Sequence, residues 1–248
     1  MTTDSASDFV LALNCGSSSI KFALFDAGQV PLRRQPAWRG QIDGIGSRQA
    51  AFDNGVAVEQ VVLDATRPYR AALMLLRDRI DALLEGRDIV AVAHRVVHGG
   101  SKYSGPARMD AGVLADLKSY SPLAPLHQPF ALEAVVMLLA ALPGVPQVAC
   151  FDTAFHDTLP IVEKILPLPR TAWDQGLRRY GFHGLSYEYL ALTLGERYGD
   201  AARARTVVAH LGSGASLCAM NNLQSTATTM GFSALDGLMM GTRCGSLD

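Results

Sequence analysis

The chain has 248 residues and a formal net charge of −1, with 49% hydrophobic and 18% charged residues. This composition is typical of a globular protein with one large or two modest domains. There is no basic block and no stripe of basic and aromatic residues, so no nucleic-acid partner is expected. No apolar run approaches the ~20 residues of a membrane-spanning helix, and the first nine residues, with two acids, are not a signal sequence.

The cysteines are few and far apart, and none of them forms a C-x-x-C pair. That spacing argues against a zinc site or a disulfide framework and suits a reducing cytosol. We therefore expect a cytoplasmic protein with no membrane partner. The four residues are Cys15, Cys150, Cys218 and Cys244.

The first predicted element is a hairpin. Two apolar, β-prone runs over residues 10–13 and 20–25 flank the small-residue loop Asn-Cys-Gly-Ser-Ser-Ser. Glycine and serine let backbone N–H groups approach an anion, while three hydroxyls and the Asn14 amide add donors. Lys21 supplies a positive charge just inside the second strand. Taken alone, this stretch is explained equally well by an ordinary tight hairpin.

The first half of the chain then passes to alternating strands and helices. We expect a third strand within residues 30–40, turns over 40–55 and a strand over 56–63. Thr66 and Pro68 mark the start of a helix that stops at Gly86. A buried strand over 89–97, helices over 110–119 and 130–141, and a strand over 145–151 follow. This order predicts an α/β fold.

The second half returns to the opening theme after a long connection. Residues 157–184 contain three prolines, so we divide the chain into domains over residues 1–157 and 158–248. A helix is expected over 186–198, followed by a strand–loop–strand unit over 206–220. Its loop, HLGSG, aligns with the first loop through a gap of one residue. Two such hairpins on a duplicated α/β core would hold one polyphosphate from two sides.

Several polar residues in apolar surroundings are candidates for a catalytic site. Arg95 lies in an apolar strand and offers a planar fork to a carboxylate or phosphate. His94 and His98 have the spacing of a helical metal pair, but on a strand they would lie ~13 Å apart, too far to share an ion. Asp152 ends an apolar strand, where ligands gather in α/β sheets, with a helix N-cap as the alternative.

Three further residues complete the candidate set. His127 follows a proline-rich segment and precedes an apolar helix, where a capping role is the alternative. His183 and Arg243 lie among glycines in RRYGFHG and MMGTRCG, and a core histidine is the alternative for His183. The combination of arginines, histidines, one aspartate and two glycine-serine loops suits phosphoryl transfer, in which fixed donors meet the charge of the moving group.

At this point several strings, in this order, resemble motifs of the acetate kinase family and of its close relative propionate kinase: NCGSSSIKF, HRVVHGG, SPLAPLHQP, FDTAFH, RRYGFHG, HLGSG and MGFSALDGLMMGTRCG. The resemblance implies duplicated actin-like, ribonuclease H-like ATPase domains, as in sugar kinases, chaperone ATPases and actin. It also implies reversible, Mg²⁺-dependent transfer of a phosphoryl group from ATP to acetate or another short-chain carboxylate, giving acetyl phosphate and ADP. A homodimer formed through the C-terminal domain, where that domain is complete, is expected on the same grounds.

The resemblance also assigns roles to single residues. Asn14 is similar to the family's magnesium-site residue and Arg95 to its substrate-binding arginine. Asp152 matches the active-site acid; a positioning or metal role suits it better than a base, because acetate is already ionised. The other catalytic positions are His127, His183 and Arg243, the last two as transition-state stabilisers. The nucleotide-phosphate contacts are Ser17, Ser19, Lys21, His210, Leu211, Gly212, Ser213 and Gly214, and the acyl pocket is Val97, Leu126 and Phe182.

Three residues depart from the family pattern. Ser213 stands in place of an asparagine, Ala234 in place of a proline and Ser246 in place of an aspartate. The family also continues past this chain into adenosine-binding motifs and a second magnesium carboxylate. We therefore expect the second domain to be incomplete and the 248-residue chain alone to have no useful turnover and poor stability. The alternative function is a non-catalytic fragment that lacks the adenosine site.

Overall fold

The computed structural model describes residues 8–247, which fall into two compact units. Unit 1 contains the chain up to residue 96 together with residues 108–118 and 125–149. Unit 2 contains residues 97–107, 119–124 and the chain from residue 150 onward. The units interleave along the sequence, and the predicted division at residue 157 stays a prediction.

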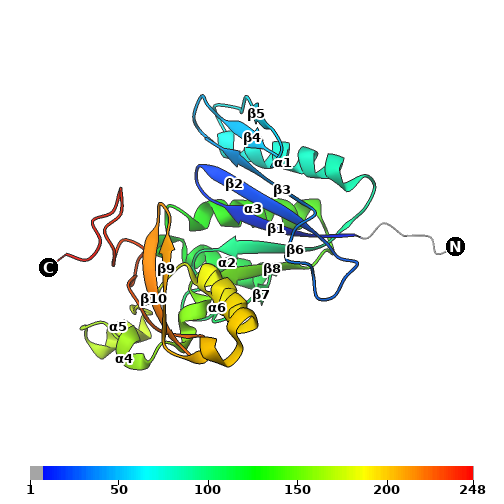
Figure 1. Cartoon of the computed structure of the whole chain (residues 1–248). Coiled ribbons are helices and arrows are strands. Elements are labelled where there is room, and N and C mark those ends of the chain that lie inside the picture. The colour runs from blue at the N-terminus through cyan, green and yellow to red at the C-terminus, as the bar shows by residue number, and fades with distance from the viewer. Residues whose placement is uncertain (1–7, 248) are drawn as a thin grey trace. The chain divides into compact units, whose positions relative to one another are not determined.

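One mixed sheet dominates the first half of the chain (Figure 1). Its order is β5-β4-β3-β2-β1-β6-β8-β7, in which β1 pairs antiparallel with β2 and parallel with β6. The strands are β1 (Phe9–Cys15), β2 (Ser19–Asp26), β3 (Trp38–Asp43), β4 (Ala51–Asp53), β5 (Val58–Gln60), β6 (Ile89–Val96), β7 (Ala107–Arg108) and β8 (Gln147–Phe151). The α/β fold class is therefore confirmed.

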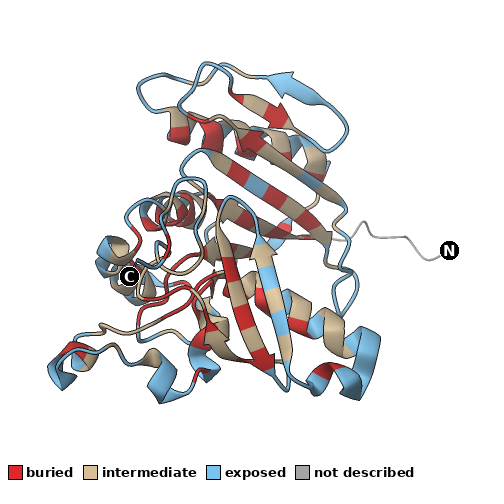
Figure 2. Ribbon diagram, turned by 60° about the vertical axis from the view of Figure 1, so that its left-hand side comes forward, coloured by how far each residue is buried: buried red, intermediate tan, exposed pale blue. Residues whose placement is uncertain are grey.

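Two helices cover one face of this sheet in unit 1, α1 (Pro68–Leu84) and α3 (Gln128–Ala141). Buried residues alternate along the strands, as the two-residue period of a half-buried strand requires (Figure 2). Leu11 on β1 packs in the same core as Leu73, Leu76 and Ile80 of α1. Burying each such side chain contributes about 1.5–3 kcal/mol, so this face is the main stabilising feature of the unit.

The predicted α1 is confirmed, with Pro68 in its first turn and a left-handed residue, Glu85, at its C-cap. Helix α2 (Ala111–Ser119) and α3 also lie where they were expected. The prediction of turns over residues 40–55 was wrong in part, because β3 and β4 occupy much of it. Ile42 and Phe52 are buried there, and the surrounding glycines concealed this apolar pair.

Unit 2 is built around a three-stranded antiparallel sheet, ordered β11-β10-β9, with helix α6 (Gly184–Tyr198) alongside it (Figure 1). The strands are β9 (Thr206–Leu211), β10 (Ala215–Asn221) and β11 (Gln224–Thr228). The long connection before α6 holds two short helices, α4 (Ile161–Lys164) and α5 (Arg170–Asp174). Single 3-10 turns lie at Ser121–Leu123, Ala154–Thr158 and Gly199–Arg203. None of the helices within residues 8–247 is long and apolar enough to span a membrane.

Strand β11 was not predicted, because its sequence, QSTAT, has no apolar alternation. Its buried side chains are polar and are held by hydrogen bonds instead. Ser225 bonds the Nδ1 atom of His156, and the Thr228 hydroxyl donates to the Leu217 carbonyl. Such partners satisfy buried hydroxyl groups but cannot be read from hydrophobic periodicity.

The two predicted hairpins are confirmed, and their registers explain the gap between their loops. In the first hairpin Cys15 pairs with Ile20, which leaves residues 16–19 as the loop. In the second, Leu211 pairs with Ala215, which leaves only residues 212–214. The second loop is therefore one residue shorter. In each half of the chain a third antiparallel strand pairs with the second strand of the hairpin. This repeated three-stranded arrangement supports a duplicated fold.

Candidate active site

His183 occupies a restricted backbone position at the N-cap of α6. Its φ of 60° is left-handed, which is uncommon for a side chain of this size. The next residue, Gly184, donates its N–H to the Asp152 carbonyl at 2.7 Å, and a Cβ atom on Gly184 would clash with that oxygen. This close approach fixes the start of α6 against the end of β8. It thereby brings the buried Asp152 and His183, two predicted site residues, to neighbouring positions.

The imidazole rings of His183 and His210 stack, with centroids 4.0 Å apart and planes inclined by 16°. Each Nδ1 atom faces a serine hydroxyl, that of His183 meeting Ser216 Oγ at 2.8 Å and that of His210 meeting Ser186 Oγ at 3.0 Å. Each Nε2 atom therefore points away from its serine. The His183 Nε2 atom lies 3.0 Å from where a Cβ atom of Gly214 would be.

Arg243 approaches the same glycine. Its Nη1 atom lies 3.6 Å from the Gly214 Cβ position and donates a hydrogen bond to the Ala234 carbonyl at 3.0 Å. The guanidinium and the His183 imidazole thus meet at the HLGSG loop. A glycine at 214 leaves room for a ligand atom between them.

An apolar cluster adjoins these donors. Val97 and Phe182 are buried in it, and Ala234 and Met240 pack against it. Phe182 directly precedes His183, and the Ala234 carbonyl holds Arg243. The cluster also contains Ala124 and Met230, which sequence reasoning did not include. It forms an apolar wall next to the two side-chain donors.

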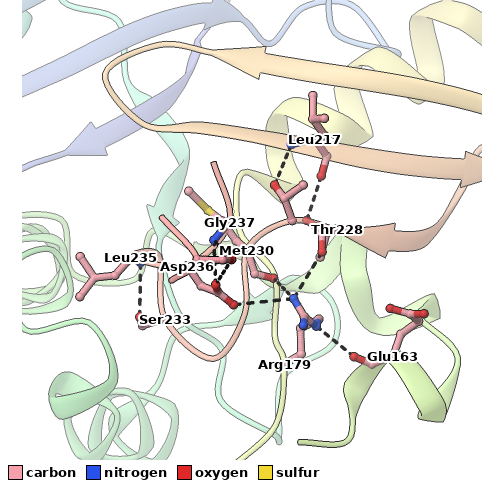
Figure 3. A network of polar contacts seen from close by, with 11 residues as sticks. Glu163, Arg179, Leu217, Thr228, Met230, Ser233, Leu235, Asp236 and Gly237 are labelled. Atoms are coloured by element: carbon pink, nitrogen blue, oxygen red, sulfur yellow. Dashed lines mark hydrogen bonds and ion pairs between the residues drawn. The ribbon is translucent and has the colours of Figure 1, made fainter. Parts of the chain in front are cut away.

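The segment that carries Arg243 is tied to β11 by a polar network around Arg179 (Figure 3). The Arg179 Nη1 atom donates to the carbonyls of Thr228 and Met230 and lies 3.9 Å from Asp236 Oδ2. Asp236 Oδ1 accepts hydrogen bonds from the Gly237 N–H and the Ser246 hydroxyl. Ser246 is one of the departures from the family pattern, and an ionised aspartate could not make this bond to Asp236.

Unit 1 holds the remaining predicted polar residues. Asn14 and Arg95 are register partners on β1 and β6, and Arg95 Nη1 donates to Asn14 Oδ1 at 2.8 Å. Ser17 and Lys21 are exposed, and Ser19 is partly exposed at the start of β2. Ser17 lies in the loop of the first hairpin, and Ser19 and Lys21 lie at the start of the strand that follows it.

Two predicted residues of unit 1 precede α3. His127 occupies the N-cap of this helix, but its side chain makes no capping hydrogen bond. The capping alternative therefore does not explain its imidazole. Leu126 is 71% exposed and is not part of the apolar cluster. Its assignment to an acyl pocket stays a prediction.

Asn14 stays a predicted magnesium residue, and the structure surrounds it as follows. The Asn14 amide oxygen already accepts from the Arg95 guanidinium, a cation that disfavours a second cation at that oxygen. Within residues 8–247, no group of three or more His, Cys, Asp or Glu side chains could hold a metal ion. Mg²⁺ commonly binds through substrate phosphates and water with one or two carboxylates. The ion would therefore depend on the phosphates of a nucleotide.

The other histidines are buried structural groups. His94 bonds Gln147 at 2.8 Å, and burial lowers its pKa. His98 packs edge-on against Tyr180 and Phe182, and burial lowers its pKa to about 4. Both rings are consequently neutral at pH 7.

Unit 2 therefore combines a loop of small residues, two convergent side-chain donors and an adjoining apolar wall, the features that a site for phosphoryl transfer requires. The family model described as "Acetokinase family" matches residues 9–248, and the chain belongs to this family.

Individual relatives agree with this assignment. The chain is 48% identical to an acetate kinase of Rhodopseudomonas palustris over 98% of its own length and 62% of the relative's. Among solved structures, a propionate kinase from Francisella tularensis matches with a TM-score of 0.85 at 34% identity over 97% of this chain and 62% of that one. The Porphyromonas gingivalis acetate kinase matches with a TM-score of 0.79 at 33% identity, covering 98% and 62%. The chain thus spans about three fifths of the length of these relatives.

Two residues that support His183 through hydrogen bonds were not predicted from the sequence. Ser216 and Tyr187 are both fully buried next to His183. Ser216 looked like part of a small-residue loop, and Tyr187 looked like an ordinary helix residue. The only available signal was a serine placed two positions beyond the glycine loop, on the inward face of β10.

Proposed function

We propose that this chain carries the phosphoryl-transfer site of an acetate kinase, which moves the γ-phosphoryl group of ATP to acetate and yields ADP and acetyl phosphate. The observation that carries the proposal is the meeting of His183 Nε2 and the Arg243 guanidinium at Gly214, beside the apolar cluster. Membership of the acetokinase family supports it.

In this reaction a carboxylate oxygen of acetate forms a bond to the γ-phosphorus. The bond from that phosphorus to the β,γ-bridging oxygen breaks, and ADP leaves with the electron pair. The transferred group carries its charge on three equatorial oxygens, which fixed donors stabilise. We assign His183 and Arg243 to these oxygens. No general base is needed, because the carboxylate of acetate is ionised at neutral pH. Asp152 is accordingly proposed to position the site.

The substrate contacts follow from the same proposal. Arg95 is proposed to bind the carboxylate, while Val97, Phe182 and Ala234 accept the alkyl end. The loop residues of both hairpins are proposed to contact the ATP phosphates, and Mg²⁺ bound to them would screen their charge. These contacts are Ser17, Ser19, Lys21, His210, Leu211, Gly212, Ser213 and Gly214, with Leu126 and His127 as further substrate and catalytic contacts.

We also propose a cytoplasmic homodimer. All four cysteines are free, which suits a reducing compartment. The homodimer rests on the likeness to the family, and light scattering of the purified chain tests it: a mass of twice 26.5 kDa is expected, and a monomer would contradict it.

Two measurements on the 248-residue chain test the function. Calorimetric titration with acetyl phosphate should show binding that Arg243→Ala weakens and that Arg197→Ala, at the end of α6, leaves unchanged. A hydroxamate assay with Mg-ATP and acetate then separates the kinase from the non-catalytic fragment. Turnover establishes the kinase in this chain, while binding without turnover identifies the fragment. A folded chain with neither would contradict the proposal.

A further inference from the structure

The hydrogen bonds behind His183 form a chain whose starting direction is fixed. The Tyr187 hydroxyl is fully buried, and Ser216 Oγ is the hydrogen-bond partner that the structure gives it within residues 8–247. The Tyr187 oxygen lies 2.5 Å from Ser216 Oγ, which in turn lies 2.8 Å from His183 Nδ1. Tyr187 and Ser216 are both 0% exposed, so bulk water does not compete for these bonds.

Each hydroxyl in this chain has one hydrogen atom to place. A buried hydroxyl hydrogen without an acceptor is costly, so the Tyr187 hydrogen points to Ser216 Oγ. Ser216 then accepts from Tyr187 and donates its hydrogen to Nδ1 of His183. In a neutral imidazole one nitrogen accepts and the other carries the hydrogen. An accepting Nδ1 therefore places the hydrogen on Nε2.

We propose that Tyr187 and Ser216 are positioning residues, which hold His183 as its Nε2–H tautomer so that it presents a donor at the glycine loop. The opposite tautomer would turn a lone pair toward a phosphoryl oxygen and repel it. The His210 ring stacks on that of His183 and restrains its rotation. The identity of the anion that receives the bond rests on the proposed function, whereas the tautomer does not.

Nitrogen NMR of the histidine side chains measures the tautomer directly, in the protein without ligand. Spectra are recorded at ~pH 8.5, well above the ordinary histidine pKa of ~6.5. The His183 signals are assigned by their loss in His183→Gln. Wild type should show a protonated Nε2 and an unprotonated Nδ1. Ser216→Ala should move the hydrogen to Nδ1 or give a mixture, and Ser216→Thr, which keeps the hydroxyl, should restore the wild-type pattern.

Tyr187→Phe provides the second arm. It should give a mixture of tautomers and weaken acetyl phosphate binding about 3–10-fold, the effect of one neutral hydrogen bond. Tyr189→Phe, an exposed position on the same helix, should change neither. Thermal unfolding shows that each variant is folded. A wild-type His183 protonated on Nδ1, or a tautomer unchanged in folded Ser216→Ala, would overturn the proposal. If the wild-type chain does not bind acetyl phosphate, the proposed function is refuted, and the tautomer result still stands.

Discussion

Substituting Gly214 by alanine tests whether the space between His183 and Arg243 holds the ligand. The new methyl group would lie 3.0 Å from His183 Nε2 and 3.6 Å from Arg243 Nη1. A phosphoryl oxygen accepting from Nε2 needs a position about 2.7–2.9 Å from it, so the methyl takes that space. The His183 ring cannot easily yield, because Ser216 holds its Nδ1 atom and its backbone is left-handed.

The expected cost is one hydrogen bond to a charged group, about 1.5–3 kcal/mol, which is roughly 10–150-fold in the dissociation constant of acetyl phosphate. Stability should fall as well, by about 1–3 kcal/mol, because the methyl crowds a His183 ring that cannot easily move away. Calorimetry and chemical denaturation measure the two effects. Gly105→Ala is the control, because an added Cβ atom meets nothing within 4 Å there and the residue has no left-handed φ. Unweakened binding by folded Gly214→Ala would refute this reasoning.

Three further predictions concern the arginines, the acyl end and pH. Arg95→Ala and Arg243→Ala should each lower turnover ~10²–10³-fold wherever the hydroxamate assay detects activity, and near-normal kcat would contradict their roles. Ala234→Pro should lower kcat/KM for propionate relative to acetate, by an amount within the ~1–3 kcal/mol of one methylene, and an unchanged ratio would rule this out. The pKa of buried His98 is lowered to about 4, so the unfolded chain binds its proton first. The free energy of unfolding is therefore unaffected by His98 above pH ~6.5 and falls by up to about 3 kcal/mol as the pH drops toward 4. Denaturant titrations at several pH values should show a smaller loss in His98→Gln. An equal loss in that variant would show that other groups cause it.

Local patterns were enough to predict the elements whose apolar residues follow a period. Helix α1 repeats leucine and isoleucine on one face, and the first hairpin joins two apolar runs through a small-residue loop. The pattern failed where partners lie far apart in sequence. Strand β11 is held by Ser225 and His156, which are 69 residues apart, and no periodicity reveals that pair.

The candidate site shows the same division. His183 and Arg243 were found because glycines and apolar residues surround them. Their convergence at Gly214 depends on tertiary packing, which no string displays. The polar support from Ser216 was missed for this reason, since a buried serine and a loop serine look alike in a sequence.

The central claim is that His183 and Arg243 receive the phosphoryl group at the HLGSG loop. It is tested most directly by titrating the chain with acetyl phosphate while following the side-chain nitrogen signals of both residues by NMR. The account predicts that the His183 Nε2–H and Arg243 guanidinium signals shift together, with the dissociation constant found by calorimetry. Saturable binding that leaves both signals unmoved would contradict it.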